Sequence, residues 1–138
     1  MASNEKLFET CSKLIKIKGQ CSFNLINELN MSELTLRQIE YLKKFDQCDW
    51  VTTSKLAEVL DLSKPSITEM IKKFIKLDCV YKEKCPEDGR VYYIHLTEKG
   101  KCIARIEELA IKKLAERIKA SLSDDEIDIL IGLFSKIE

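Results

Sequence analysis

The 138-residue chain lacks a long apolar run, lacks any Cys-x-x-Cys pair, and contains a single histidine. A helix that crosses a bilayer needs about 20 consecutive apolar residues, so no membrane span is expected. The six cysteines are scattered, and none stands at ligand spacing from His95, so we expect no metal and no cofactor. The start of the chain is polar and acidic where a signal peptide needs an apolar core, which indicates a cytoplasmic protein.

Net charge is also absent, because 23 basic residues balance 23 acidic ones. Any surface that binds nucleic acid must therefore come from local separation of charge, and residues 52–102 hold ten Lys or Arg against eight acids. The length fits one globular domain with its own core. An enzyme is not expected, since nucleophilic catalysis needs a paired base and His95 has no obvious partner.

The segment 63–77 predicts an amphipathic helix. Its apolar residues recur at helical spacing and are Ile67, Met70, Ile71, Phe74 and Ile75. At about 100° per residue, the opposite face carries hydroxyls and lysines. Ser63 is the expected N-cap, and Pro65 fits the first turn, where its missing N–H costs nothing.

A second short helix precedes this one, capped by Thr52 or Thr53 and ending near Asp61. Two short helices joined by a tight turn predict a helix-turn-helix, whose second helix enters the major groove of DNA. Thr53 and Ser54 would then contact phosphate from a helix N-terminus.

A β-hairpin is predicted directly after the second helix. Residues 80–84 and 91–96 are rich in β-branched and aromatic side chains, and the residues between them favour a turn. Arg90 stands near the tip, where Asp88 could hold its guanidinium, and an arginine at such a tip can enter a narrow minor groove. The hairpin is interpreted as the wing of a winged helix, with Cys85 exposed beside it.

Helical patterns occupy both ends of the chain, over residues 5–29, 97–120 and 123–134, and another covers 34–45. Capping boxes start two of them, at Thr35-x-x-Gln38 and Ser123-x-x-Glu126. The apolar faces of the terminal helices exceed what a small central module can cover. Packing against a second copy with two-fold symmetry is the natural solution, so a homodimer is expected.

Three features together, Leu34-Thr35-x-x-Gln38, the helix-turn-helix and Asp88-Gly89-Arg90 followed by Leu96-Thr97-Glu98-Lys99-Gly100, resemble the MarR family of transcriptional regulators. The resemblance covers essentially the whole chain. It implies a mainly α fold with a small β-hairpin wing. Residues 34–97 would form the winged helix-turn-helix, and residues 1–33 and 98–138 would form a helical dimerisation part. It further implies binding to a pseudo-palindromic operator on double-stranded DNA, usually as a repressor; Gly89 replaces a basic residue common in the family's wing.

The expected DNA contacts divide by chemistry. Lysines would neutralise phosphates, hydroxyls and a carboxylate would touch base edges, and the wing would add its tip. The predicted set is Thr53, Ser54, Lys64, Ser66, Thr68, Glu69, Lys72, Lys73, Lys76, Asp88 and Arg90.

Two modes of regulation stay open. A small-molecule effector could favour one separation of the two reading heads. Alternatively, Cys11 or Cys21 could act as a redox sensor in the first helix, although both lie among apolar neighbours and structural packing is the preferred interpretation. An alternative function is a winged-helix module that binds proteins and not DNA, which zero net charge and the acidic residues near the wing keep open.

Overall fold

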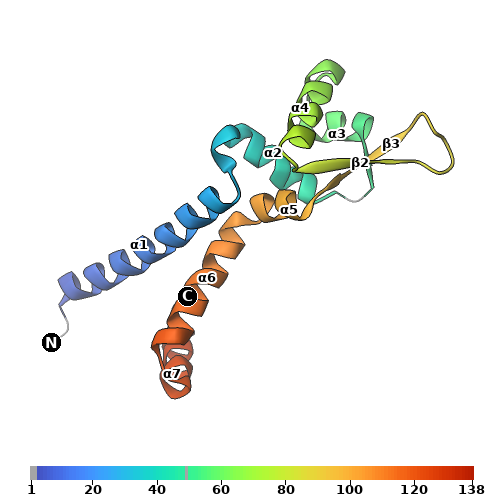
Figure 1. Cartoon of the computed structure of the whole chain (residues 1–138). Coiled ribbons are helices and arrows are strands. Elements are labelled where there is room, and N and C mark those ends of the chain that lie inside the picture. The colour runs from blue at the N-terminus through green and yellow to red at the C-terminus, as the bar shows by residue number, and fades with distance from the viewer. Residues whose placement is uncertain (1–2, 49) are drawn as a thin grey trace. The chain divides into compact units, whose positions relative to one another are not determined.

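The computed structural model describes residues 3–48 and 50–138 and is mainly helical, with one small sheet (Figure 1). The chain forms two compact units. Residues 26–106 make the first, which we call the winged-helix unit, and residues 1–25 with 107–138 make the second, which we call the helical unit. The predicted fold class, mainly α with a β-hairpin wing, is confirmed.

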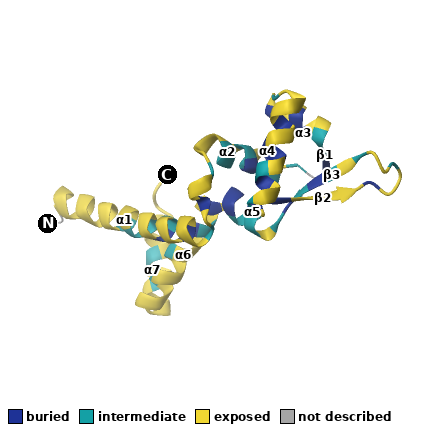
Figure 2. Ribbon diagram, turned by 45° about the horizontal axis from the view of Figure 1, so that its top comes forward, coloured by how far each residue is buried: buried dark blue, intermediate teal, exposed yellow. Residues whose placement is uncertain are grey.

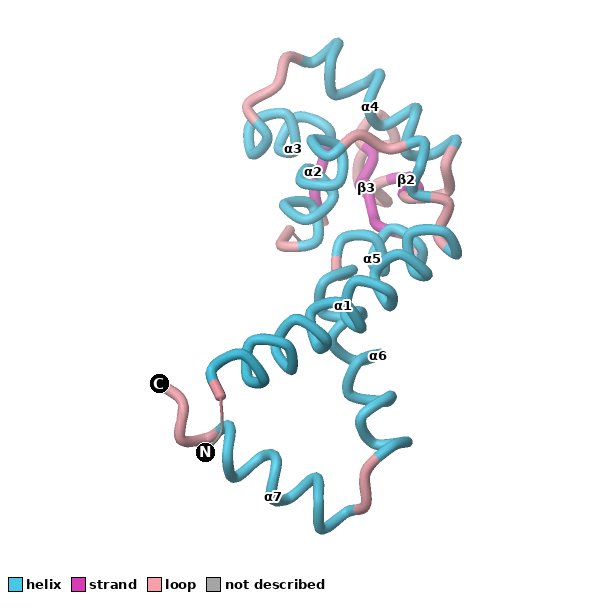
Figure 3. Tube along the Cα trace, turned by 90° about the vertical axis from the view of Figure 1, so that its left-hand side faces the viewer, coloured by secondary structure: helices cyan, strands magenta, loops and turns pink. Residues whose placement is uncertain are grey.

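The winged-helix unit contains four α-helices and three strands among its described residues. After the 3₁₀ turn η1 (Met31–Glu33) its elements are α2 (Leu36–Asp46), β1 (Val51–Thr52), α3 (Thr53–Leu60), α4 (Lys64–Lys76), β2 (Val80–Lys84), β3 (Tyr92–Leu96) and α5 (Glu98–Ala104). The chain makes a tight turn between α3 and α4 (Figure 3). This is the predicted helix-turn-helix followed by the predicted hairpin.

The sheet is antiparallel, with strand order β1-β3-β2. In the hairpin, Val80 pairs with Leu96 and Tyr81 with His95. The third strand, β1, was not predicted because it is only two residues long, and Val51 opposite Ile94 gives it one buried contact with the hairpin. It ties the start of α3 to the sheet.

Buried side chains gather in the winged-helix unit, where they appear dark blue in Figure 2. Strand β3 and the helices contribute side chains with no exposed surface or almost none. These are Leu42, Leu56, Ile67, Phe74, Cys79, Ile94 and Ile103. Together they form a closed core, which no second chain is needed to complete.

Both predicted capping boxes are confirmed. The Thr35 hydroxyl accepts a hydrogen bond from the Gln38 backbone N–H at 3.1 Å, and Gln38 Oε1 accepts one from Thr35 N–H at 3.0 Å. Ser123 and Glu126 make the same pair of bonds at the start of α7. Each box satisfies two backbone amides that a helix start otherwise leaves unpaired.

The helical unit is built from α1 (Asn4–Glu28), α6 (Ile106–Ser121) and α7 (Asp124–Phe134), the first of which runs on into the winged-helix unit. An ion pair between Lys18 and Glu107 and a hydrogen bond between Arg117 and Gln20 join α1 to α6. None of the residues of α7 is buried, and the helix appears yellow and teal in Figure 2. This unit therefore has much less of a core.

One expected helix differs from the structure. The pattern over 97–120 predicted a continuous helix, but it is interrupted at Arg105, whose φ of −107° and ψ of 23° end α5 before α6 begins. The guanidinium of Arg105 donates two hydrogen bonds to the Asp46 carboxylate, at 2.8 and 2.9 Å. This contact holds α5 against the end of α2, and the apolar periodicity of the sequence does not reveal it.

Candidate nucleic-acid interface

The turn that joins α3 to α4 depends on Asp61, which takes the left-handed conformation with φ of 54°. Glycine is the usual residue at such a helix end, but aspartate tolerates this region better than most residues. The N–H of Leu62 donates to the Ala57 carbonyl at 2.9 Å, which closes the end of α3. Ser63 then caps α4 by accepting from Ser66 N–H at 3.3 Å.

Helix α4 separates its residues sharply by face. Ile67 and Phe74 have no exposed surface, and Met70 and Ile71 are also buried. Ile75, predicted to lie in the core, is 40% exposed and stands at the edge of the buried stripe. The exposed polar side chains, which we call the recognition face, are Lys64, Ser66, Thr68, Glu69, Lys72 and Lys76. A helix whose apolar face is fully used can present this other face to a ligand.

Local bonds already occupy part of the recognition face. The Thr68 hydroxyl donates to the Lys64 carbonyl at 2.9 Å, so its remaining capacity is as an acceptor. Lys72 lies 3.5 Å from Glu69, and both side chains are more than two-thirds exposed. Exposed pairs of this kind are weak, so either side chain can exchange its partner for a phosphate or a base.

Lys73 is placed differently from its neighbouring lysines. Its ammonium donates to Gln38 Oε1 at 2.9 Å, and the residue is only partly exposed. Gln38 Oε1 is the same atom that closes the capping box of α2. Lys73 therefore ties α4 to the start of α2, and its sequence position among outward lysines gave no sign of this.

Thr53 and Ser54 are the first two residues of α3, and Thr52 provides the cap. The Thr52 hydroxyl accepts from Lys55 N–H at 3.1 Å. Ser54 is exposed and Thr53 is half-buried. Both stand at the positive end of a helix, which favours a nearby anion.

The wing tip carries the predicted pair. Asp88 Oδ1 accepts from the backbone N–H of Arg90 at 3.0 Å and from its Nε at 3.3 Å. The Arg90 side chain is nevertheless 92% exposed, so the carboxylate orients the guanidinium without covering it. Cys85, predicted to be exposed, is buried; its thiol lies 3.9 Å from the Tyr93 hydroxyl, and this contact raises the pKa of Tyr93.

The far end of α4 is fixed by the segment Leu96-Thr97-Glu98-Lys99-Gly100. The Lys99 ammonium donates to the Leu77 carbonyl at 2.9 Å, and the Thr97 hydroxyl donates to the Asp78 carbonyl at 2.6 Å. A Cβ on Gly100 would lie 2.0 Å from the Cys79 carbonyl oxygen, so only glycine fits there. These contacts explain in physical terms why this run of residues follows the wing: it orients the recognition face relative to α5.

A groove of about 520 Å³ lies between α4 and the start of α2. Arg37 lines it together with Ser66 and Glu69 of the recognition face, and Arg37 is exposed. Sequence reasoning missed this arginine, because only the packing of α2 against α4 brings it beside the recognition face. It adds a cation to a surface that the sequence assigned to lysines alone.

The two cysteines predicted as redox candidates have different surroundings. Cys11 is exposed, whereas Cys21 is buried. Among residues 3–48 and 50–138, no group of three or more His, Cys, Asp or Glu side chains could hold a metal ion. Within the same residues, no helix is both long enough and apolar enough to cross a bilayer.

Comparison with known proteins gives a consistent result. Residues 34–92 match the model of the MarR family. The chain is 31% identical over 88 residues to a Thauera aromatica protein assigned as a transcriptional regulatory protein for the hcr operon, which covers 63% of this chain and 52% of that protein. The match thus spans about half the length of this relative.

Two further relatives extend over more of the chain. An uncharacterised helix-turn-helix transcriptional regulator of Bacillus subtilis, YpoP, is 27% identical over 116 residues, which are 83% of this chain and 82% of that protein. The crystal structure of a MarR variant from E. coli in complex with operator DNA superposes with a TM-score of 0.53 at 23% identity, covering 99% of both chains. At that identity the structural likeness shows the fold alone.

Proposed function

Because the chain belongs to the MarR family, we propose that it is a homodimeric transcriptional regulator that binds a pseudo-palindromic operator on double-stranded DNA. The observation that carries this proposal is the division of α4, whose apolar face is buried while its recognition face is exposed and cationic. A major groove admits such a helix. The regulators named among its relatives, and the E. coli relative bound to operator DNA, support the same function.

In this proposal each part of the interface has its own role. Lys64, Lys72 and Lys76 neutralise phosphates and set the affinity, while Ser66, Thr68 and Glu69 touch base edges. Lys73 holds α4 in place and lies beside the DNA. Thr53 and Ser54 contact phosphate at the start of α3, and Arg90, oriented by Asp88, enters the minor groove.

The two units divide the work between them. Residues 34–97 read the DNA, and the helices formed by residues 1–33 and 98–138 pair two copies. A two-fold dimer would place its recognition helices in major grooves about one helical turn apart. The protein represses transcription in the cytoplasm without catalysing a reaction, and a small-molecule or redox signal, the latter through Cys11 or Cys21, releases it from DNA.

Selection of bound sequences from a random duplex pool tests this function. We expect enrichment of an inverted repeat whose half-sites are separated by about one helical turn. A pool that shows no enrichment, together with no salt-sensitive binding to random duplex at low ionic strength, would refute DNA binding and leave the protein-binding module as the function.

Lys72→Ala tests the phosphate contacts. The variant should weaken binding to all duplexes similarly and reduce the slope of log affinity against log salt by about 1. Lys113→Ala is the matched control, because Lys113 is also an exposed helical lysine near a glutamate, at 3.7 Å from Glu116, but lies on α6. An unchanged slope for Lys72→Ala would remove Lys72 from the interface.

Arg90→Ala tests the wing. The variant should lose operator affinity while its thermal unfolding stays unchanged, since the side chain is almost fully exposed. Undiminished affinity for the operator would limit DNA reading to α3 and α4.

A further inference from the structure

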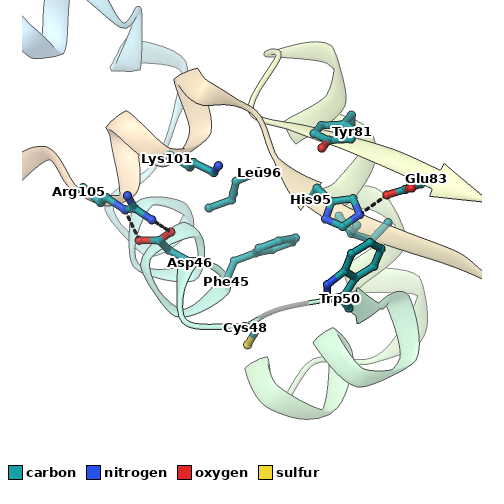
Figure 4. A pocket seen from close by; sticks show the side chains of 11 residues that line it. Phe45, Asp46, Cys48, Trp50, Tyr81, Glu83, His95, Leu96, Lys101 and Arg105 are labelled. Carbon is teal, nitrogen blue, oxygen red and sulfur yellow. Dashed lines mark hydrogen bonds and ion pairs between the residues drawn. The ribbon is translucent and has the colours of Figure 1, made fainter.

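A cavity of about 400 Å³ opens on the winged-helix unit between the end of α2, the sheet and α5; we call it the sheet cavity (Figure 4). Its floor includes Phe45 and Leu96. None of its lining residues belongs to α3, α4 or the wing tip, so the proposed DNA interface does not use it.

One end of the sheet cavity is aromatic. The His95 ring lies 5.2 Å from the rings of both Trp50 and Tyr81, and Trp50 is edge-on to it at 87°. Trp50 has a φ of 53°, whereas the other three non-glycine residues with positive φ among the described residues are Asn or Asp, which tolerate it. For a bulky residue this conformation is costly and marks sites held by their surroundings. The backbone thus holds a 63% exposed indole at the edge of the cavity.

Both carboxylates of the sheet cavity already have partners. Asp46 accepts two hydrogen bonds from Arg105. Glu83 lies 2.8 Å from His95 Nε2, a contact that has the distance of an ion pair but not the direction of an N–H hydrogen bond. The dashed lines in Figure 4 show these two pairs at opposite ends of the cavity. The negative charges of the lining are therefore balanced from within.

Donors, by contrast, remain available. The indole N–H of Trp50 finds no acceptor among residues 3–48 and 50–138. Lys101 has only Glu98 at 3.6 Å, whose side chain is 91% exposed, and a pair of this kind holds an ammonium weakly. A ligand that supplies an acceptor or a negative charge gains more here than one that supplies a donor.

We propose that the sheet cavity binds a small, flat aromatic anion. The ring packs against Phe45 and Leu96 beside the edge of Trp50, and the acid group accepts from Lys101. Aromatic rings gain in such surroundings both from burial and from edge-to-face contact. The proposal concerns binding to the winged-helix unit itself and is independent of whether DNA is bound.

Trp50 is the only tryptophan of the chain, so its fluorescence reports on this cavity alone. Titration of the full-length protein with benzoate should change the emission saturably and shift the indole N–H resonance in a nitrogen-proton correlation spectrum. Benzamide has the same ring without the charge, so its affinity should be about tenfold weaker, as expected for loss of one charge-assisted hydrogen bond. Benzylammonium and acetate, which lack the anion and the ring respectively, should produce no saturable change.

Lys101→Met should lower the affinity for benzoate to that for benzamide and leave benzamide binding unchanged. Lys112→Met is the matched control, since Lys112 also pairs with a helical glutamate, Glu108 at 3.4 Å, but lies outside the cavity. Circular dichroism of both variants establishes that they fold. The proposal is overturned if benzoate leaves both Trp50 signals unchanged, if benzamide binds as tightly as benzoate, or if Lys101→Met binds benzoate normally. Because no DNA is present, each of these results leaves the proposed DNA-binding function untouched.

Discussion

The two units of the chain use their apolar residues in opposite ways. In the winged-helix unit Phe74 has no exposed surface, whereas in the helical unit Phe8 is 72% and Phe134 is 52% exposed. The same residue type is thus core in one unit and surface in the other. A single chain completes the first fold but not the second.

The exposed apolar side chains of the helical unit are numerous and occur on all three of its helices. They include Leu7, Phe8, Ile15, Phe23, Ile111, Ile129, Ile131, Leu133 and Phe134. Soluble proteins rarely leave so much apolar surface in contact with water unless another surface covers it. The comparison teaches that the winged-helix unit is stable by its own packing, while the helical unit gains its stability through association, as the proposed homodimer requires.

Replacement of matched phenylalanines is the strongest way to break this comparison. Phe74→Ala should lower the free energy of unfolding by about 3–5 kcal/mol, because the variant loses buried area and leaves a cavity. Phe134→Ala should change the unfolding of the winged-helix unit by less than about 0.5 kcal/mol. Urea denaturation followed by circular dichroism measures both.

Protein concentration provides the control for this pair. The effect of Phe74→Ala should be the same in dilute and concentrated samples, whereas Phe134→Ala should weaken association and so act through concentration. Equal losses for the two variants in dilute samples would show that the helical unit also has a complete core of its own.

Two glycines sharpen the same comparison with a smaller effect. Gly100→Ala should destabilise the protein by roughly 1–3 kcal/mol, because the added Cβ would overlap the Cys79 carbonyl oxygen and neither backbone can yield easily. Gly19→Ala in α1 meets nothing within 4 Å and should stabilise that helix by roughly 0.5–1 kcal/mol through reduced backbone entropy in the unfolded chain. Thermal unfolding should therefore shift in opposite directions for the two variants, and a shift in the same direction would contradict the packing described for the α4–β2 turn.

The parts of the fold that local chemistry determines could be predicted from the sequence. The spacing of Ile67, Met70 and Phe74 predicted α4, and the two capping boxes predicted the starts of α2 and α7. The pairing of Asp88 with Arg90 also followed from their separation by two residues. In each case the interacting groups lie within a few residues of one another.

Features that depend on distant contacts could not be predicted. Lys73 resembles its neighbours in sequence but binds Gln38, 35 residues away. The interruption of the helix at Arg105 falls at a residue that binds Asp46, and Arg37 joins the recognition face only because α2 packs beside α4. Cys85 follows a strand of exposed residues, and nothing in its local pattern indicates that its thiol turns toward Tyr93.

The smallest predicted effect compares the two capping boxes, which share a geometry but differ in charge. In α7 the backbone N–H of Ser123 donates to the Glu126 carboxylate, and this bond lowers the pKa of Glu126 from its ordinary value of 4.5. The ionised form is therefore favoured in the folded state. Its contribution to the stability of α7 is fully present above pH 4.5 and is lost as the pH falls through the lowered pKa. In α2 the corresponding acceptor is the uncharged amide of Gln38, so that box should not titrate.

The amide proton resonances of Ser123 and Thr35 measure this difference within one sample. On acidification from pH 7, the Ser123 resonance should move with a midpoint below 4.5, while the Thr35 resonance stays in place. Glu126→Gln should abolish the movement at Ser123 yet keep the bond, because glutamine offers the same oxygen without the charge. A Ser123 amide that still titrated in Glu126→Gln would assign the transition to a different carboxylate, and one that never titrated would mean that the cap of α7 is open in solution.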